Sequence, residues 1–384
     1  MEDGRRHRLG WSAVLIAAAL AAGLGGTVLF QTQGPTAPSS HSTTLRGSLP
    51  SPADPGAWTS CTSGQLPMGG NRDVVVVGGD STGRWQIGTA QPGGQGRAVV
   101  WHDGKLVGLA GKDHAAIILT GINSSGVAVG TDQSKDIAKG GPPVDEVPYV
   151  YRNGVFSKLH GGNGRAVAIN DAGVIVGELD LPGVTLPVRW KSMNAQPELL
   201  RLPAGTEGGG VSDIAADGTI AGYENTGPGY LWRADGTMQR IDPPTIPGIP
   251  ATGTVTPARF RFGWLIAGVQ VYYYDPVVNA SRAPSDRVRG ERGMEFRYRP
   301  QPPSWELLSD GIEAAPEGEA GTSPGIWVGH ARRSLPPYQP AVKLRSTTYV
   351  VPYISEDGHT AAGTAGAGDP ASNAPSLPII WRCR

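Results

Sequence analysis

The sequence predicts an all-β protein, a seven-bladed β-propeller that follows an N-terminal transmembrane helix. Three observations lead to this prediction. A repeat of about 45 residues occurs seven times, an uncharged run of 22 residues follows a basic flank, and two cysteines stand at the two ends of the repeat region. A repeat of this length with turn residues at fixed positions is typical of propellers.

Each repeat contains a turn ending in glycine, a few β-branched or small residues, and a second glycine. The second glycines are 42, 47, 45, 46, 61 and 34 residues apart, and a period near 45 matches a blade of about four short strands. The seven copies are Gly83 to Gly88, Gly126 to Gly130, Gly173 to Gly177, Gly218 to Gly222, Gly263 to Gly268, Gly325 to Gly329 and Gly358 to Gly363.

We call each of these glycine-bounded copies a phrase. A short apolar strand ending in an aromatic residue follows each phrase, except that none is evident after the sixth. Several of these strands lead into tight turns such as HDG and RNG, which favour hairpins because their residues tolerate positive φ. Each repeat therefore predicts four strands, a to d, and we expect the aromatic residues to pack between blades rather than to bind sugars. In blade six, strand d is expected to be missing or merged. The aromatic residues are Trp101, Tyr151, Trp190, Trp232, Tyr298 and Trp381.

Phrases such as AVAINDAGVIVGE, followed later by a strand ending in Trp, resemble the bacterial extracellular HAF-repeat family. The resemblance covers roughly residues 61 to 384 and is clearest in the second to fourth repeats. It implies an exported repeat protein with propeller-like units. It implies no reaction and no catalytic residues.

The ring is predicted to close through the two ends of the repeat region. The last repeat ends after its strand c, and residues 61 to 70 resemble a strand d, so the beginning of the chain is expected to complete the last blade. Cys61 and Cys383 then lie side by side, and we predict a disulfide between them. Two free thiols, or an intermolecular bridge at Cys61, are the alternatives.

The N-terminal region is predicted to anchor the protein in a membrane. Residues 1–8 form a short basic cytoplasmic tail, residues 9–30 a transmembrane signal-anchor, residues 31–57 a Pro/Ser/Thr-rich linker, and residues 58–384 the propeller. The 22 apolar positions span about 33 Å as a helix, enough for a bilayer core. The positive-inside rule then places the propeller on the extracytoplasmic side. A cleaved signal peptide is the competing interpretation.

The loops between strands b and c vary most in length, so we expect recognition on the face that they form. The best candidate is the insertion 270–294, with Tyr272, Tyr273, Tyr274, Arg282, Arg287, Arg289 and Arg292, residue types enriched at binding hot spots. In the alternative interpretation the tyrosines continue strand b and the arginines form a solvated loop.

No motif for catalysis, a metal or a cofactor is present, and 33 basic residues balance 33 acidic ones, which disfavours nucleic-acid binding. The pairs His102-Asp103 and Asp113-His114, and also His330 and His359, are interpreted as ordinary turn and loop polarity. We expect a monomeric, non-enzymatic scaffold that binds an extracytoplasmic protein or glycan. The alternative is an envelope-polymer hydrolase or lyase with a site at the central channel. A signalling sensor is disfavoured by the short tail.

Overall fold

The computed structural model describes residues 56–90, 96–110, 116–133, 146–225, 227–246, 251–274, 289–300, 303–309, 323–328, 331–339, 347–367 and 375–384. The predicted cytoplasmic tail and membrane anchor, and all but the last two residues of the linker, lie outside these ranges. Within the described ranges no helix has the length and apolar character needed to cross a bilayer.

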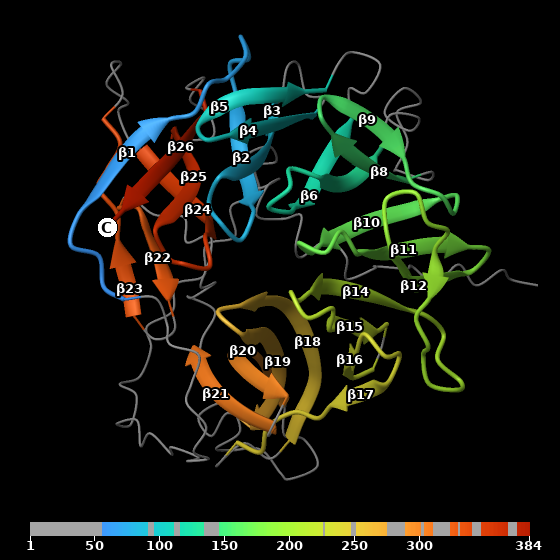
Figure 1. The fold of residues 1–384 in the computed structure, drawn as a ribbon. Helices are drawn as coiled ribbons and strands as arrows, with labels where there is room; N and C mark the ends of the chain where they lie inside the picture. Colours follow the sequence, from blue (N-terminus) through green and yellow to red (C-terminus); the bar gives the residue numbers. More distant parts are fainter. Residues whose placement is uncertain are drawn as a thin grey trace, which may run out of the picture.

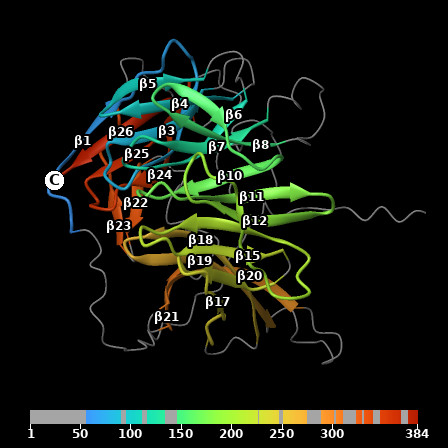
Figure 2. The same ribbon diagram turned by 45° about the vertical axis from the view of Figure 1, so that its right-hand side comes forward.

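The described strands form six four-stranded sheets and one two-stranded sheet, and every strand pair is antiparallel. Figures 1 and 2 show the sheets one after another around a central axis in chain order, and we number them 1 to 7 in that order. Sheet 1 contains β2 (Val74–Gly79), β3 (Trp85–Ala90), β4 (Arg97–His102) and β5 (Lys105–Leu109), and sheet 2 contains β6 (Ile117–Ile122), β7 (Ala128–Asp132), β8 (Val147–Arg152) and β9 (Val155–Lys158). Sheet 3 contains β10 (Gly164–Ile169), β11 (Ile175–Leu181), β12 (Val184–Trp190) and β13 (Glu198–Leu199), and sheet 4 contains β14 (Gly209–Ile214), β15 (Ile220–Glu224), β16 (Gly229–Trp232) and β17 (Met238–Ile241). Sheet 5 contains β18 (Ala251–Arg261), β19 (Trp264–Tyr274), β20 (Arg289–Pro300) and β21 (Pro303–Ser309), and sheet 6 contains β22 (Gly325–Val328) and β23 (Ala331–Ser334). Sheet 7 contains β24 (Thr347–Ile354), β25 (Thr360–Ala367), β26 (Leu377–Cys383) and β1 (Cys61–Gln65).

The all-β prediction is confirmed, and so are the four strands expected in the third repeat, which are β10 to β13. The hairpin turns predicted after strand c are present as well. Asp103 and Asn153 both have φ of 50°, and the glycine that follows each also has positive φ, as tight hairpin turns require.

In five copies of the repeat the second glycine, namely Gly88, Gly130, Gly177, Gly222 or Gly363, lies where the backbone of the neighbouring strand approaches closely. A Cβ atom added at Gly130 would overlap the carbonyl oxygen of Ile118, and one added at Gly177 would overlap that of Arg165. Both contacts adjoin a bulge in the first strand of the sheet. These glycines are therefore structural, as the sequence indicates.

Apolar clusters join neighbouring sheets around the ring. Among the described residues, six hydrophobic clusters lie at the junctions of sheets 1 and 2, 2 and 3, 3 and 4, 4 and 5, 6 and 7, and 7 and 1. The junction between sheets 5 and 6 has no comparable cluster in the described part of the chain. The core is thus a series of layers between sheets.

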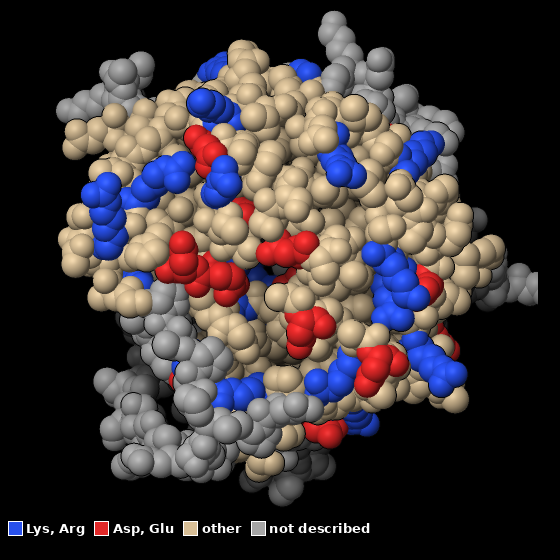
Figure 3. Space-filling model, viewed as in Figure 1, with Lys and Arg blue, Asp and Glu red and all other residues tan. Residues whose placement is uncertain are grey.

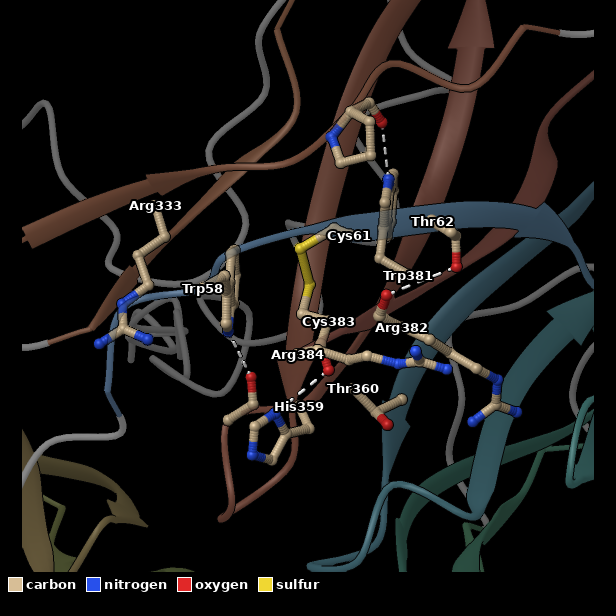
Figure 4. Close-up of a disulfide and its surroundings, with 12 residues drawn as sticks. Trp58, Cys61, Thr62, Arg333, His359, Thr360, Trp381, Arg382, Cys383 and Arg384 are labelled. Atoms are coloured by element: carbon tan, nitrogen blue, oxygen red, sulfur yellow. Dashed lines mark hydrogen bonds between the residues drawn. A yellow bond between two sulfur atoms is a disulfide. The ribbon is translucent and has the colours of Figure 1, made fainter.

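The ring closes as predicted. The strand β1 pairs with β26, with Cys61 opposite Cys383, and the two sulfur atoms form a disulfide. Figure 4 shows this bond with its surroundings, including Trp58, whose Nε1 donates to the carbonyl oxygen of Gly358 at 2.7 Å. The beginning of the described chain therefore lies against the last sheet.

The assignment of the sixth phrase to a strand b is wrong. The residues from Gly325 form β22, which turns directly into β23, and the amide of Leu335 donates to Pro324 O just as that of Leu159 donates to Pro148 O after β9. The pair β22 and β23 is therefore the c–d hairpin of its sheet, and strand d is neither missing nor merged. The segment 347–354, assigned to blade six, is β24, the first strand of sheet 7.

The sequence signal for this correction is a proline three positions before the aromatic residue that ends strand c. It stands before Tyr151, Trp190 and Trp381, and Pro324 stands in the same position before Trp327. The glycines on both sides of IWV match the pattern of a strand b. Only the strand pairing shows that this segment is a strand c.

Candidate functional site

The candidate recognition residues lie mostly on two long paired strands. Tyr272, Tyr273 and Tyr274 end β19, and Tyr274 lies opposite Arg289 at the start of β20. Arg292 lies opposite Val271. The backbone pairing therefore agrees with the alternative in which the tyrosines continue strand b. Arg282 and Arg287 lie outside the described residues.

The strands of sheet 5 are longer than those of its neighbours. The strands β18 and β19 have 11 residues and β20 has 12, whereas β15 has 5. Six additional residues extend a strand by about 20 Å. The register places Tyr272 opposite Ala251 and Glu291, so β18 and β20 accompany β19 into this extension. The extension lies at the end where strands b and c are connected.

The two ends of the strands form two rims of the ring. We call the rim with the a–b and c–d turns, such as residues 123–127 and 153–154, the turn rim. We call the opposite rim, with the b–c connections such as residues 182–183 and 225–228, the loop rim. The described chain begins on the turn rim, because Trp58 donates to Gly358 O in an a–b turn. The extension of sheet 5 belongs to the loop rim.

Asparagine side chains link successive a–b turns on the turn rim. Asn123 Nδ2 donates to Asn170 O at 3.1 Å, and Asn170 Nδ2 donates to Ala215 O at 3.2 Å. The Oδ1 atoms of both asparagines accept backbone N–H groups of their own turns. Each asparagine side chain thus stabilises its own a–b turn and also bonds to the backbone of the equivalent turn in the next sheet.

Further hydrogen bonds connect turns of different sheets, and some of them join sheets that are not neighbours in the chain, such as 1 with 3 and 5 with 7. Ser81 Oγ donates to Asp171 Oδ2 at 2.9 Å, and Ser124 N donates to Asp171 Oδ1 at 2.7 Å. Burial raises the pKa of Asp171, but these bonds to Ser124 and Ser81 outweigh it and hold the pKa below its usual value. Phe262 N donates to Glu356 Oε2 at 2.9 Å, and Glu356 N donates to Ser81 O at 2.9 Å. The turns of sheets 1, 2, 3, 5 and 7 are therefore tied together around the axis.

Asp213 joins sheets 4 and 5 near the same end of the strands. Its carboxylate accepts Phe260 N at 2.7 Å and Ile214 N at 2.8 Å. Burial raises the pKa of Asp213 to about 6, although these bonds and the nearby Arg261 and Arg259 act in the opposite direction. The carboxylates of this rim thus serve as acceptors within the fold. Among the described residues no group of three His, Cys, Asp or Glu side chains is arranged to hold a metal ion.

A buried ion pair at the junction of sheets 3 and 4 was not predicted from the sequence. Arg165 Nε donates to Glu178 Oε2 at 2.8 Å, and Val211 N donates to Glu178 Oε1 at 3.3 Å. Burial raises the pKa of Glu178 despite the neighbouring guanidinium, and burial also raises the pKa of Tyr223 to about 12. The glutamate stands directly after the second glycine, where three other copies have threonine (Thr89, Thr131 and Thr364), and this departure was the available signal.

The aromatic residues that end strand c pack between sheets, as predicted. All six are buried, and five of them donate a hydrogen bond to the backbone of the preceding sheet, so they form no open platform for sugars. The indole donors and their acceptors are Trp101 to Pro67 O, Trp190 to His160 O, Trp232 to Arg201 O and Trp381 to Pro336 O, at 2.6–2.8 Å, and Tyr151 OH donates to Val107 O at 3.2 Å.

The histidines form no catalytic arrangement in the described part of the chain. His102 stacks on Trp85 with ring centroids 3.9 Å apart and lies 3.3 Å from Asp103 in a hairpin turn. His359 Nδ1 lies 3.1 Å from Cys383 O. The remaining candidates, Asp113-His114 and His330, lie outside the described residues.

No family model and no curated protein matches the chain. Solved structures similar to it include TolB from Acinetobacter baumannii, with 10% identity, 86% of this chain and 65% of that chain covered, and a TM-score of 0.38. A prolyl endopeptidase has 11% identity, 78% and 49% coverage and a TM-score of 0.42. An oligogalacturonate lyase in complex with manganese has 8% identity, 86% and 99% coverage and a TM-score of 0.42. The chain thus spans about two thirds of TolB and half of the endopeptidase, and we draw no functional conclusion from similarities at this level.

Proposed function

We propose that the chain is a membrane-anchored, extracytoplasmic seven-bladed β-propeller that binds a protein or glycan through its loop rim and catalyses no reaction. The sheets 1 to 7 are its blades. Residues 9–30 are the anchor, and the propeller is monomeric. Membership of the HAF-repeat family is part of the proposal, supported by the phrase AVAINDAGVIVGE, which spans β10 and β11.

The extension of sheet 5 supports binding at the loop rim most directly. Three neighbouring strands, β18 to β20, lengthen together and bring three tyrosines and two arginines beyond the length of the other sheets. Because these three strands are paired, their backbone is ordered before a partner binds, which lowers the entropic cost of binding. The described chain begins on the opposite rim, so an anchored molecule presents this extension away from the membrane.

A hydrolase or lyase acting on envelope polymers is the second candidate, because acidic side chains gather near the axis on the turn rim. Figure 3 shows them around the centre of the ring. The three carboxylates best placed for such a role, Asp171, Asp213 and Glu356, all accept backbone N–H groups. Carboxylates that accept hydrogen bonds within turns stabilise the fold. We therefore rank a binding function ahead of an enzymatic one.

Site-directed photo-cross-linking tests the proposal. A photoreactive residue at Tyr273 in the full chain, expressed in its own cells, is expected to capture a specific extracytoplasmic partner. The same residue at Thr237 on the turn rim is the matched control. Cross-links from Thr237 alone, or identical products from both positions, would contradict recognition through the loop rim.

The anchor and the monomer are tested separately. Intact mass measured on detergent-extracted protein is expected to include residues 1–30. Light scattering of the same sample is expected to give one chain per particle. A mass that begins after residue 30 would replace the anchor by a cleaved signal peptide.

A further inference from the structure

A basic residue follows the aromatic residue at the end of strand c in six of the seven sheets. This position lies on the turn rim, next to the c–d turn. In sheet 6 the residue is Val328. We call the six basic residues the basic ring: His102, Arg152, Lys191, Arg233, Arg299 and Arg382.

Three members of the basic ring, Arg152, Arg233 and Arg382, make few contacts within the described part of the chain. Arg152, Lys191 and Arg382 are exposed. Arg152 contacts only Met193 Sδ, at 3.7 Å, and Arg233 donates to the amide oxygen of Gln239 at 3.1 Å. Within the described ranges, Arg152, Arg233 and Arg382 have no carboxylate at ion-pair distance. A recurring position without a recurring internal partner points to a ligand outside the molecule.

The other members have internal contacts that leave the ring accessible. Lys191 Nζ lies 2.7 Å from Glu198, and its side chain is still 64% exposed. His102 lies beside Asp103, and Arg299 stacks over Trp264 with its guanidinium carbon 4.5 Å from the ring centroid. In Figure 3 a group of acidic side chains surrounds the centre, and the basic side chains lie farther out, some of them beside further acidic ones.

The N-terminal end of the described chain lies on the same rim. Thr59 N donates to Arg384 O at 2.7 Å, and Trp58 contacts the turn at Gly358. A linker of 27 residues (31–57) separates this point from the predicted anchor. A disordered chain of this length, as the composition of the linker predicts, has an end-to-end distance of about 30 Å, so the rim is expected to stay near the membrane. Tethering at this distance gives the turn rim an effective concentration at the membrane surface in the millimolar range.

We propose that the basic ring binds the anionic headgroups of the membrane in which the chain is anchored. The ring is roughly planar because its members stand at equivalent strand ends, and a planar set of cations fits a lipid surface. The acidic side chains near the axis are engaged in turns, as Asp171 is with Ser81 and Ser124. Binding orients the loop rim outward. This inference depends on the anchor in the proposed function and on no partner of the loop rim.

Hydrogen exchange of the full chain reconstituted into vesicles tests this. We expect the amides of the c–d turns, residues 153–155 and 234–237, to exchange severalfold more slowly in vesicles rich in phosphatidylglycerol than in phosphatidylcholine alone. Each arginine near an anionic surface contributes about fivefold to binding. The triple variant Arg152→Gln, Arg233→Gln and Arg382→Gln should lose the difference, and so should the wild type at high salt.

A matched control removes the same charge from the ends of strands d. Lys158→Gln, Arg201→Gln and Arg240→Gln, all exposed, should keep the lipid dependence. Equal exchange in the two vesicle types, or slowing that persists in the triple variant, would overturn the proposal. Slowing by soluble polyphosphate that exceeds slowing by vesicles would assign the ring to an anionic polymer instead. Cross-linking at Tyr273 is read independently, so failure here and failure of the loop-rim function are distinguishable.

Discussion

The two faces of sheet 5 differ sharply. The face toward sheet 4 is apolar, with Leu265, Val269 and Phe296 buried in a shared cluster. On the other face Arg259 lies opposite Ile266, Arg261 opposite Trp264, and Arg297 opposite Glu306, and residues directly opposite in antiparallel strands share a face. One sheet therefore has an apolar junction on one side and an arginine-rich surface on the other.

The arginine-rich face is organised around Trp264. The guanidinium carbons of Arg297 and Arg299 lie 4.4 and 4.5 Å from its ring centroid, and Arg297 Nε donates to Glu306 Oε2 at 2.7 Å. Among the described residues the indole nitrogen of Trp264 has no hydrogen-bond partner, in contrast to that of Trp232. In sheet 5 the repeat is thus regular on the side where apolar residues fill the junction and irregular on the side that carries the arginines.

The largest expected effect concerns the one junction that is closed covalently. The double variant Cys61→Ser and Cys383→Ser should lose about 3 to 5 kcal/mol of unfolding free energy, because the disulfide closes a sequence separation of 322 residues and constrains the unfolded chain. Urea denaturation followed by tryptophan fluorescence measures this. Reductant should lower the wild type to the same value and leave the variant unchanged. A loss below 1 kcal/mol would show that the paired strands β1 and β26 suffice for closure.

The regular part of the ring should depend on its asparagine links. Asn170→Ala removes the acceptor of Val174 N and the donor to Ala215 O, and two unpartnered groups should cost about 2 kcal/mol. Denaturant midpoints measure the change. Asn225→Ala, at an exposed position, is the control, and a surface substitution of this kind usually changes stability by less than about 0.5 kcal/mol.

Trp232 and Trp264 allow the regular junctions and the arginine-rich face to be compared directly. Trp232→Phe loses the bond to Arg201 O and should cost about 1 to 2 kcal/mol. Trp264→Phe removes a buried donor without an acceptor, which compensates for weaker stacking with the arginines, so stability should change by less than about 1 kcal/mol. Both variants are compared by thermal and urea unfolding. Equal losses would show that the arginine-rich face is packed as tightly as the apolar one.

A further effect is a pH dependence at Asp213. Its folded pKa of about 6 exceeds the usual 3.8, so its protonated form is favoured in the folded state. The contribution to stability is fully present below pH 3.8 and is lost as the pH rises through 6. The unfolding free energy of the wild type relative to Asp213→Asn should therefore rise by about 1 to 2 kcal/mol between pH 7 and pH 4. A difference independent of pH would exclude a raised pKa at this position.

The sequence predicted the sheets best where the copies are alike. All four strands of the third repeat were predicted correctly, because its apolar residues alternate with period 2 and its turns contain Asn, Asp and Gly. The sixth repeat is misassigned because glycines around IWV imitate another phrase. The tyrosines of the candidate recognition site were identified, but their place on a paired strand depends on the extension of β18 and β20. Glu178 and Asp213 gave only weak local signals, since burial is decided by neighbouring sheets.

The sequence by itself determined the all-β class, the repeat, the closing strand and the cysteine pair, because periodicity and turn chemistry are local and recur in each copy. Only the tertiary structure decided which side chains from different sheets meet. The bond from Ser81 to Asp171, the raised pKa of Asp213 and the apolar cluster between sheets 4 and 5 all arise between residues from different repeats. No local pattern encodes them, because each depends on how sheets far apart in the chain are brought together around one axis.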